Sequence, residues 1–190
     1  MQQPLECFTF TGRFPVFRNR ISSMIFVSPS RDTSVMQLKV RALWDLGASV
    51  TLISKSLAGR LGTELSQTTS CLRTALGLET QVPEGEAWIT IVLGSFPVRM
   101  KVMVTERVCS DKDIDIVLGL DFIAKGDFLL SNDGGQLMFS FCYPSGFPID
   151  FHEALSKLNI PHAHFEDENA DGSLALAIRN GENLTMNYKP

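Results

Sequence analysis

Strand-like patterns recur along most of this chain. In them, apolar and polar residues alternate with a period of two, or β-branched and aromatic residues form short runs, and both patterns are typical of β-strands. Gly94-Ser95 and residues 132–135, Asn-Asp-Gly-Gly, lie between such stretches and predict hairpin turns. The predicted strands are residues 8–11, 22–27, 35–42, 68–75, 86–93, 96–104, 129–131, 137–141 and 174–178. The pattern therefore predicts a mostly β protein.

Helical patterns are few and short. Ser54 is a suitable N-cap, and Gly62 a suitable end, for a helix over residues 55–61. Two other short helices are predicted over residues 121–126 and 151–158.

Residues 42–54 form an apolar run that carries a single carboxylate, Asp45. Burying a charged group is costly unless it has a partner or its pKa shifts. Gly47, two residues later, allows a tight turn and the close approach of another chain segment. One interpretation of this run is two strands joined by a turn, with Asp45 solvated at the turn. The other is a site that positions the Asp45 carboxylate for catalysis.

A second stretch, residues 114–123, favours the chemical interpretation. It is an apolar strand that ends in Leu118-Gly119 and runs into the start of a short helix. An Asp-x-Gly-Ala-Ser motif followed by such a strand resembles the retropepsin-like aspartic proteases, in which Leu118-Gly119 corresponds to a structural motif. Residues 125–132 and 139–141 resemble the bacterial branch of that family in particular.

The resemblance implies a fold and a domain organisation. The implied fold is a closed β-barrel that corresponds to one half of an acid protease, with one or two short helices. The resemblance covers residues 24–145, which we predict to be the retropepsin-like domain. Residues 1–23 are then an N-terminal extension, and residues 146–190 a small C-terminal appendage.

The resemblance also implies the residues of a site. Asp45 corresponds to the catalytic residue, and the substrate-binding residues beside it are Gly47, Ala48 and Ser49. Gly47 is implied to offer its carbonyl to the substrate backbone, and Ser49 to lie near the substrate.

A β-hairpin that closes over the substrate, the flap, is implied between the two motifs. We assign residues 74–81 to it, with Leu76, Gly77 and Leu78 as substrate-binding residues. Residues 82–85 are an alternative position for its tip, and an ordinary surface hairpin is an alternative interpretation of the segment.

An aspartic protease needs two carboxylates that share one proton around a water molecule. The sequence holds one Asp-x-Gly-Ala stretch, and no Asp directly precedes Gly119. The second Asp45 must therefore come from a second copy of the chain. This predicts a homodimer with twofold symmetry, its site on the axis, acting on a peptide or protein substrate.

Leu46 departs from the family pattern, in which Thr or Ser follows the catalytic Asp and hydrogen-bonds the partner loop. Leucine cannot form that bond, and an unmet buried polar group costs about 1–3 kcal/mol. Leu46 leaves open a second interpretation, a retropepsin-like dimeric binding or assembly module without catalysis. A third is an unrelated β-rich domain with a chance Asp-Leu-Gly-Ala.

Composition limits the cellular compartment and the kinds of binding partner that we expect. The net charge of −4 and the isoelectric point near 5.4 provide no basic field for nucleic acid or anionic lipid. No apolar run approaches the ~18 residues of a membrane span, and the N-terminus lacks the pattern of a signal peptide. The four cysteines are widely spaced, as expected for free thiols. A cytoplasmic protein that binds neither nucleic acid nor membrane is expected.

No cofactor is expected, because the sequence has neither a phosphate-binding glycine loop nor a dinucleotide fingerprint. His152, Glu153, His162 and His164 are the only metal candidates. We interpret the two later histidines as loop residues and predict no metal site. Five further acids are interpreted as solvated loop or helix-cap residues: Asp111, Asp113, Asp115, Asp121 and Asp127.

Overall fold

The computed structural model describes residues 7–15, 20–34, 36–69, 72–73, 80–81, 83–146, 157, 162–165, 174–179 and 187–188. The chain forms two compact units, residues 1–147 and residues 148–190. Among the described residues, no helix is both long enough and apolar enough to cross a membrane.

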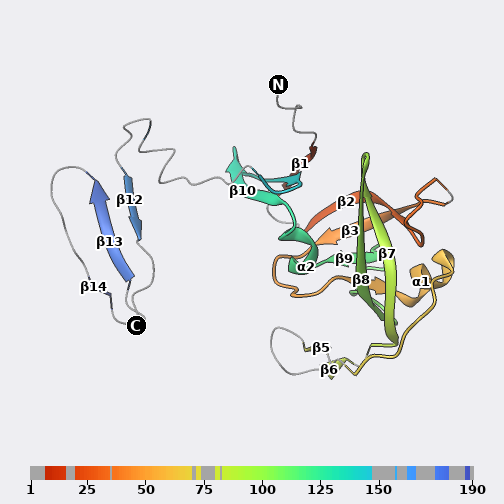
Figure 1. Ribbon diagram of the computed structural model, residues 1–190. Coiled ribbons are helices and arrows are strands. Elements are labelled where there is room, and N and C mark those ends of the chain that lie inside the picture. The colour runs from red at the N-terminus through yellow and green to blue at the C-terminus, as the bar shows by residue number, and fades with distance from the viewer. Residues whose placement is uncertain are drawn as a thin grey trace. The chain divides into compact units, whose positions relative to one another are not determined.

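Six strands of the first unit close into a barrel in the order β2-β3-β9-β4-β8-β7 (Figure 1). The pairs β3–β9 and β4–β8 are parallel, and the other neighbours in the barrel are antiparallel. The predicted mostly β class and closed barrel are therefore confirmed. The strands are β2 (Ile21–Ser28), β3 (Leu38–Trp44), β4 (Leu52–Ser54), β7 (Gly85–Leu93), β8 (Phe96–Thr105) and β9 (Ile116–Leu118).

The alternating pattern fills the barrel because side chains of successive strand residues point to opposite faces. Along β3, Val40, Ala42 and Trp44 are buried, whereas Lys39 and Arg41 are exposed. The barrel core therefore leads directly to Asp45, the first residue after β3.

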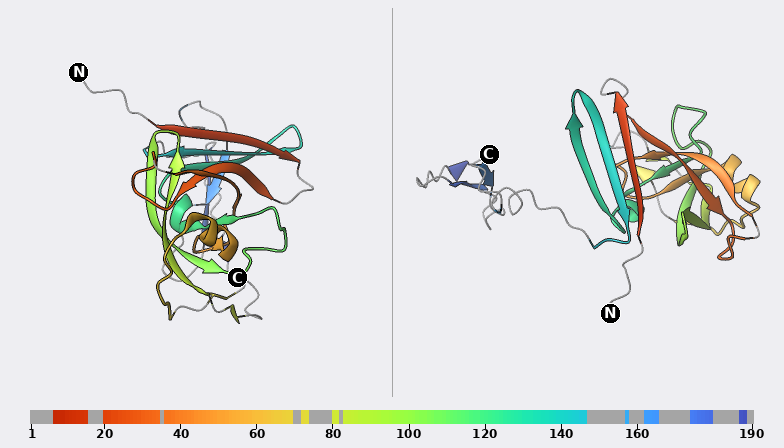
Figure 2. Two further views of the ribbon diagram at one scale, coloured as in Figure 1. Left: turned by 90° about the vertical axis from the view of Figure 1, so that its right-hand side faces the viewer. Right: turned by 90° about the horizontal axis from the view of Figure 1, so that it is seen from above.

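A second sheet packs its aromatic face against this core. It has the order β1-β11-β10, formed by β1 (Phe8–Pro15), β11 (Gln136–Tyr143) and β10 (Asp127–Asp133). The hairpin predicted around residues 132–135 is confirmed. Both views in Figure 2 show the red β1 beside the teal strands β10 and β11.

The first strand, predicted over residues 8–11, is longer in the structure. Gly12 pairs with Phe139, and β1 continues to Pro15. The strand continues because Phe14, like Phe10, packs against the hydrophobic core. Residues that resembled an extension in the sequence thus contribute a strand to the first unit.

Two short helices lie in the first unit. α1 (Lys55–Leu61) begins at Ser54, whose hydroxyl accepts a hydrogen bond from the Leu57 N–H at 3.1 Å, and ends at Gly62, whose φ is 64°. This agrees with the predicted caps. α2 (Leu120–Ile123) is one residue earlier at its start and shorter than predicted, because the chain turns at residues 124–126 to enter β10.

The second unit contains the antiparallel strands β12 (His162–Phe165), β13 (Leu174–Arg179) and β14 (Asn187–Tyr188). β13 confirms the predicted strand. The loop interpretation of His162 and His164 was wrong, because both lie in β12 and pair with β13. The helix predicted over residues 151–158 lies outside the described residues except at Lys157.

Candidate active site

Asp45 lies where β3 leaves the barrel, and its side chain is half-buried. Its N–H donates to the Leu118 carbonyl at the end of β9, at 3.0 Å. The two motifs identified in the sequence therefore meet through the backbone of the acidic residue itself.

The carboxylate of Asp45 is fixed by its own turn. Its Oδ1 accepts a hydrogen bond from the Gly47 N–H at 2.9 Å, and its carbonyl accepts one from the Ala48 N–H at 3.2 Å. This is the turn that an Asp two residues before a Gly favours. The solvated-turn interpretation is correct about the turn but not about full solvation of Asp45. Gly47 and Ser49 are exposed beside it, while Ala48 is partly buried.

The second motif holds the other end of the loop over residues 45–50, which we call the acidic loop because it carries Asp45. The N–H groups of Leu120 and Asp121 donate to the carbonyls of Ala48 and Ser49, at 2.8 and 3.3 Å. A Cβ on Gly119 would lie 2.5 Å from the backbone of Val50, so only glycine allows the two segments to approach this closely. The structure thus brings Leu118 and Gly119, two residues of the predicted structural motif, to the loop that carries Asp45.

Thr51 and Asp121 add a contact that sequence reasoning missed. Thr51 is fully buried, and its hydroxyl donates to Asp121 Oδ1 at 2.6 Å and accepts from the Gly119 N–H at 3.1 Å. A hydroxyl inside a β-branched run needs such a partner, and this was the available signal. Of the two interpretations given for Asp121, a solvated loop acid or a helix-cap acid, its position in the first turn of α2 favours the second. Its bond to Thr51 was not predicted.

Two other acids first assigned to solvent also have specific partners. Asp115 forms an ion pair with Arg60 at 3.0 Å. Asp127 accepts hydrogen bonds from the Ser145 hydroxyl and the Gly146 N–H, at 2.6 and 2.7 Å. These contacts are local and lie outside the acidic loop.

Trp44, directly before Asp45, is the centre of an aromatic cluster. Its ring stacks on Phe10 of β1 with centroids 5.9 Å apart and planes 4° apart. It also lies 5.0–5.9 Å from Phe141, Phe139 and Phe122. The indole N–H is satisfied by the Ser23 hydroxyl at 2.9 Å. Trp44, which belongs to the barrel, is therefore held in place by the second sheet and by α2, and this fixes the position of the adjacent Asp45.

A cavity of about 520 Å³ lies beside Asp45. Among its lining residues, Asp45 is the one carboxylate and Arg20 the one cation. Leu46 lines the same cavity and packs against the hydrophobic core. The lining residues are Arg20, Ile21, Leu43, Trp44, Asp45, Leu46, Gly47 and Leu137. The arrangement can present one carboxylate to a ligand, and a dyad requires a second one.

Part of the predicted flap is described. β5 (Leu72–Arg73) pairs antiparallel with β6 (Thr80–Gln81). Leu76, Gly77 and Leu78 lie outside the described residues. The alternative tip at residues 82–85 was wrong, because Gly85 begins β7 and the Glu84 N–H bonds the Val104 carbonyl of β8 at 2.8 Å.

The strand predicted over residues 68–75 is shorter in the structure. Thr68 and Thr69 precede β5 without belonging to a strand, and of the remaining predicted residues the structure describes only β5.

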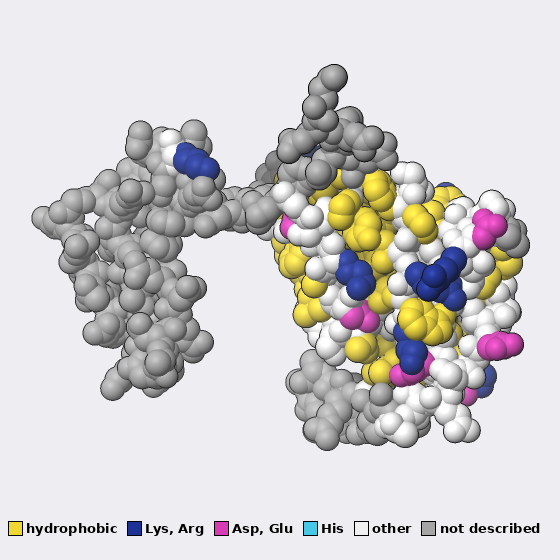
Figure 3. Space-filling view, in the orientation of Figure 1, with side chains coloured by type: hydrophobic (Ala, Val, Ile, Leu, Met, Phe, Trp, Pro, Cys, Tyr) yellow, Lys and Arg dark blue, Asp and Glu magenta, His cyan; other side chains and the backbone are white. Residues whose placement is uncertain are grey.

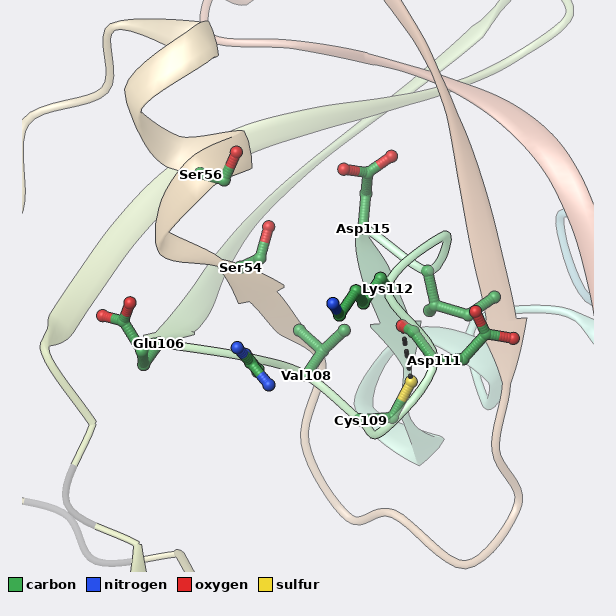
Figure 4. Close-up of a pocket in the computed structure, with 10 residues that line it drawn as sticks. Ser54, Ser56, Glu106, Val108, Cys109, Asp111, Lys112 and Asp115 are labelled. Carbon is green, nitrogen blue, oxygen red and sulfur yellow. Dashed lines mark hydrogen bonds between the residues drawn. The ribbon is translucent and has the colours of Figure 1, made fainter.

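A cavity of about 320 Å³ lies near Asp115 (Figure 4). Asp115 directly precedes the first residue of β9, whereas Leu118 is the last residue of that strand. It contains three carboxylates, which raises the question of an alternative acid pair. Glu106, Asp111 and Asp115 are, however, paired with Lys55, Arg20 and Arg60 at 3.5, 3.3 and 3.0 Å. Because each of these acids already contacts a cation, this cavity does not offer a pair of free carboxylates for a dyad.

A larger open hollow of about 700 Å³ lies over β7 and β8. Arg99 lies over the exposed ring of Trp88, 5.8 Å from its centroid. Figure 3 shows dark-blue cations beside yellow apolar side chains on this face. The hollow is lined by the outer face of the barrel, whereas Asp45 follows the end of β3.

Within the part of the chain that the structure describes, no group of three or more His, Cys, Asp or Glu side chains could hold a metal ion. The candidate residues His152 and Glu153 lie outside that part.

The comparison with protein families covers both motifs. Residues 32–122 match the family model described as aspartyl protease. Among curated proteins, none matches the chain. A retropepsin-like aspartic protease from Rickettsia conorii is similar in structure, with 20% identity and a TM-score of 0.48 over 75% of this chain and 98% of that one.

Two other solved structures are similar. EIAV protease, complexed with the inhibitor HBY-793, has 14% identity and a TM-score of 0.42 over 55% of this chain and 86% of that one. The retroviral protease-like domain of Ddi1 from Leishmania major has 18% identity and a TM-score of 0.38 over 61% of this chain and 91% of that one.

Proposed function

We infer that this chain, whose residues 32–122 match the aspartyl protease family model, is a retropepsin-like endopeptidase that acts as a homodimer. The observation that supports this proposal most is the fixed carboxylate of Asp45. It is half-buried, accepts the Gly47 N–H, and lines a cavity beside exposed backbone.

The proposed chemistry uses one Asp45 from each of two chains. Two carboxylates about 3 Å apart cannot both be ionised, so the pair holds one proton between them. The ionised carboxylate takes a proton from a water molecule as its oxygen attacks the peptide carbonyl carbon. The protonated carboxylate donates to the carbonyl oxygen. When the tetrahedral intermediate collapses, the C–N bond breaks and the leaving nitrogen takes a proton.

The need for a partner is supported by the number of carboxylates. The sequence has one Asp-x-Gly-Ala stretch, and Asp45 is the single acid among the described residues that line its cavity. A second copy related by a twofold axis would supply an identical carboxylate on an identical loop.

Substrate binding is proposed at both sides of the acidic loop. Gly47 and Ser49 are exposed and adjacent to Asp45. The Gly47 N–H and the Ser49 carbonyl are bonded within the site, so the Gly47 carbonyl and the Ser49 side chain are the groups proposed to face an extended peptide. We propose that residues 74–81, which include Leu76, Gly77 and Leu78 between β5 and β6, cover the substrate as a flap. Ala48, which lies between Gly47 and Ser49, is the third substrate-binding residue that we propose in the acidic loop.

The proposed organisation keeps a retropepsin-like domain that ends near residue 145 and a C-terminal appendage from residue 146. We propose the cytoplasm as its compartment. The described cysteines Cys7, Cys109 and Cys142 are free thiols, and a reducing compartment keeps thiols in that state.

The shared site can be tested by mixing subunits. Wild-type chain is unfolded and refolded together with an increasing excess of Asp45→Asn chain, and peptide cleavage is measured against total dimer. If each site needs two Asp45 residues, mixed dimers are inactive and activity falls with the square of the wild-type fraction. A linear fall would contradict the shared site while leaving a peptidase possible.

Leu46 favours a second candidate function, a retropepsin-like dimeric binding or assembly module. Its side chain offers no hydrogen bond to a partner loop, and it packs against the hydrophobic core. In this case the wild-type chain would dimerise without cleaving peptides. Activity that appears in Leu46→Thr but not in Leu46→Val would identify the missing hydroxyl as the cause.

A further inference from the structure

Two cysteines far apart in the sequence meet on the outer face of the β1-β11-β10 sheet. Thr9 of β1 lies opposite Cys142 of β11, and Cys7 lies two residues before Thr9. Continued by one residue beyond the ladder, the direction of β1 carries Cys7 to the same side of the sheet as Thr9, diagonal to Cys142.

Cys7 has freedom to approach its neighbour. The β1–β11 ladder begins with Phe8 opposite Tyr143, so Cys7 lies just before it. This matters because a disulfide requires Cα atoms about 4.4–6.8 Å apart, and diagonal partners in a regular ladder are about 7–8 Å apart. A residue outside the ladder can close that difference by backbone rotation.

We propose that Cys7 and Cys142 form a thiol–disulfide exchange site that reacts with an oxidised low-molecular-weight disulfide and closes a bond between β1 and β11. The proposal does not depend on the proposed peptidase activity.

The exchange balances in two steps. The Cys7 thiolate attacks one sulfur of the small disulfide, breaks its S–S bond and releases one small thiolate, which takes up the proton that Cys7 has lost. Cys142, after losing its proton, attacks the Cys7 sulfur of the mixed disulfide and releases the second small thiolate, which takes up that proton. Two protein thiols are oxidised, and one small disulfide is reduced to two thiols.

The environments of the two thiols assign their roles. Cys7 is exposed and meets the small disulfide first, whereas Cys142 is partly buried. Burial raises the pKa of Cys142, and the neighbouring Cys7 and the charge of Asp127 raise it further. A raised pKa means less thiolate, so Cys142 is suited to the second, intramolecular step.

The bond would strengthen the support of the acidic loop. β1 carries Phe10, which stacks on Trp44, the residue before Asp45. A link from residue 7 to residue 142 also closes a long loop, which restricts the unfolded chain strongly. Oxidation is therefore expected to raise the thermal midpoint by roughly 5–15 °C.

The test uses the full chain and glutathione disulfide. The reduced wild type, Cys7→Ser, Cys142→Ser and a Cys71→Ser/Cys109→Ser control are incubated with the reagent and analysed by intact mass and non-reducing peptide mapping. We expect the wild type and the control to lose two hydrogens and to yield a peptide linking Cys7 to Cys142. Cys142→Ser should instead retain one glutathione on Cys7.

Melting curves of the oxidised and reduced control complete the test. The expected result is a higher midpoint for the oxidised form, reversed by dithiothreitol. A control that stops at glutathione on Cys7, a linkage in the wild type that uses Cys71 or Cys109 instead, or an unchanged midpoint in the linked form would each overturn the proposal.

Discussion

The hydroxyl of Thr51 and the carboxylate of Asp121 are joined by a 2.6 Å hydrogen bond. The same hydroxyl accepts from the Gly119 N–H. Because Thr51 follows the acidic loop and Asp121 lies in the first turn of α2, one buried side chain links the Asp45 motif to the Gly119 motif. The rigidity of the candidate site thus depends on two residues outside the predicted substrate-binding set.

Thr51→Val keeps the shape of the side chain and removes both hydrogen bonds. It leaves the Gly119 N–H without this acceptor in a buried position, so we expect a loss of about 1–3 kcal/mol in the free energy of unfolding. Thr51→Ser is the matched control and should lose less, because it keeps the hydroxyl. Urea unfolding curves measure both, and equal losses in the two variants would contradict the role of the hydroxyl.

Gly119→Ala tests the close approach of the two motifs. The φ of Gly119 is −89°, which alanine adopts freely, so the effect isolates the contact with Val50. Overpacking against the backbone should cost about 1–3 kcal/mol. The control is Gly59→Ala, in a helix with open space around the new methyl group, which should stabilise by about 0.5–1 kcal/mol. Similar thermal midpoints for the two variants would refute the packing argument.

Phe10→Ala tests whether β1 is part of the folded domain. Phe10 packs against the core and stacks on Trp44, so its removal should cost about 2–4 kcal/mol. Phe128 of β10 is 43% exposed in the same sheet, and Phe128→Ala should cost clearly less. Chemical denaturation gives both values. A dispensable Phe10 would mean that residues 8–15 are an extension after all.

The pair Glu86–Lys101 predicts a local pH dependence. The Lys101 amine, at 2.8 Å, and the Thr68 hydroxyl hold the pKa of Glu86 below its ordinary value of 4.5. A carboxyl whose pKa is lowered by folding adds stability above the unfolded pKa and loses it as the pH falls through the folded pKa. An NMR titration should find the Glu86 pKa below 4.5, and Lys101→Met should raise it. An unchanged value in the variant would exclude the ion pair as the cause.

The sequence predicted the barrel strands because they depend on local signals, and it marked Asp45 and Gly119 as two motifs without showing that they meet. Alternation marked β3, and Asp and Gly at fixed spacing marked the turn. The Thr51–Asp121 bond was missed because neither residue is unusual alone, and only folding brings them together. Phe10 was assigned to an extension because its partner Trp44 lies on another strand, and period-two patterns say nothing about pairing between distant strands.

Strand β12 of the C-terminal unit could not be predicted from the sequence pattern. β12 holds His162 and His164 next to a proline and ahead of an acidic stretch, which resembles a loop in sequence. Its strand conformation follows from pairing with β13. Short strands that depend on a partner carry little local signal.

Cleavage of a diverse peptide library between pH 4 and 7, with wild-type chain compared to Asp45→Asn, tests the central claim most directly. We predict cleavage by the wild type and a loss of about a hundredfold or more in Asp45→Asn, while the dimer remains intact in sedimentation. A well-folded wild-type dimer that cleaves nothing across this range, or an Asp45→Asn variant that cleaves as well as wild type, would contradict it.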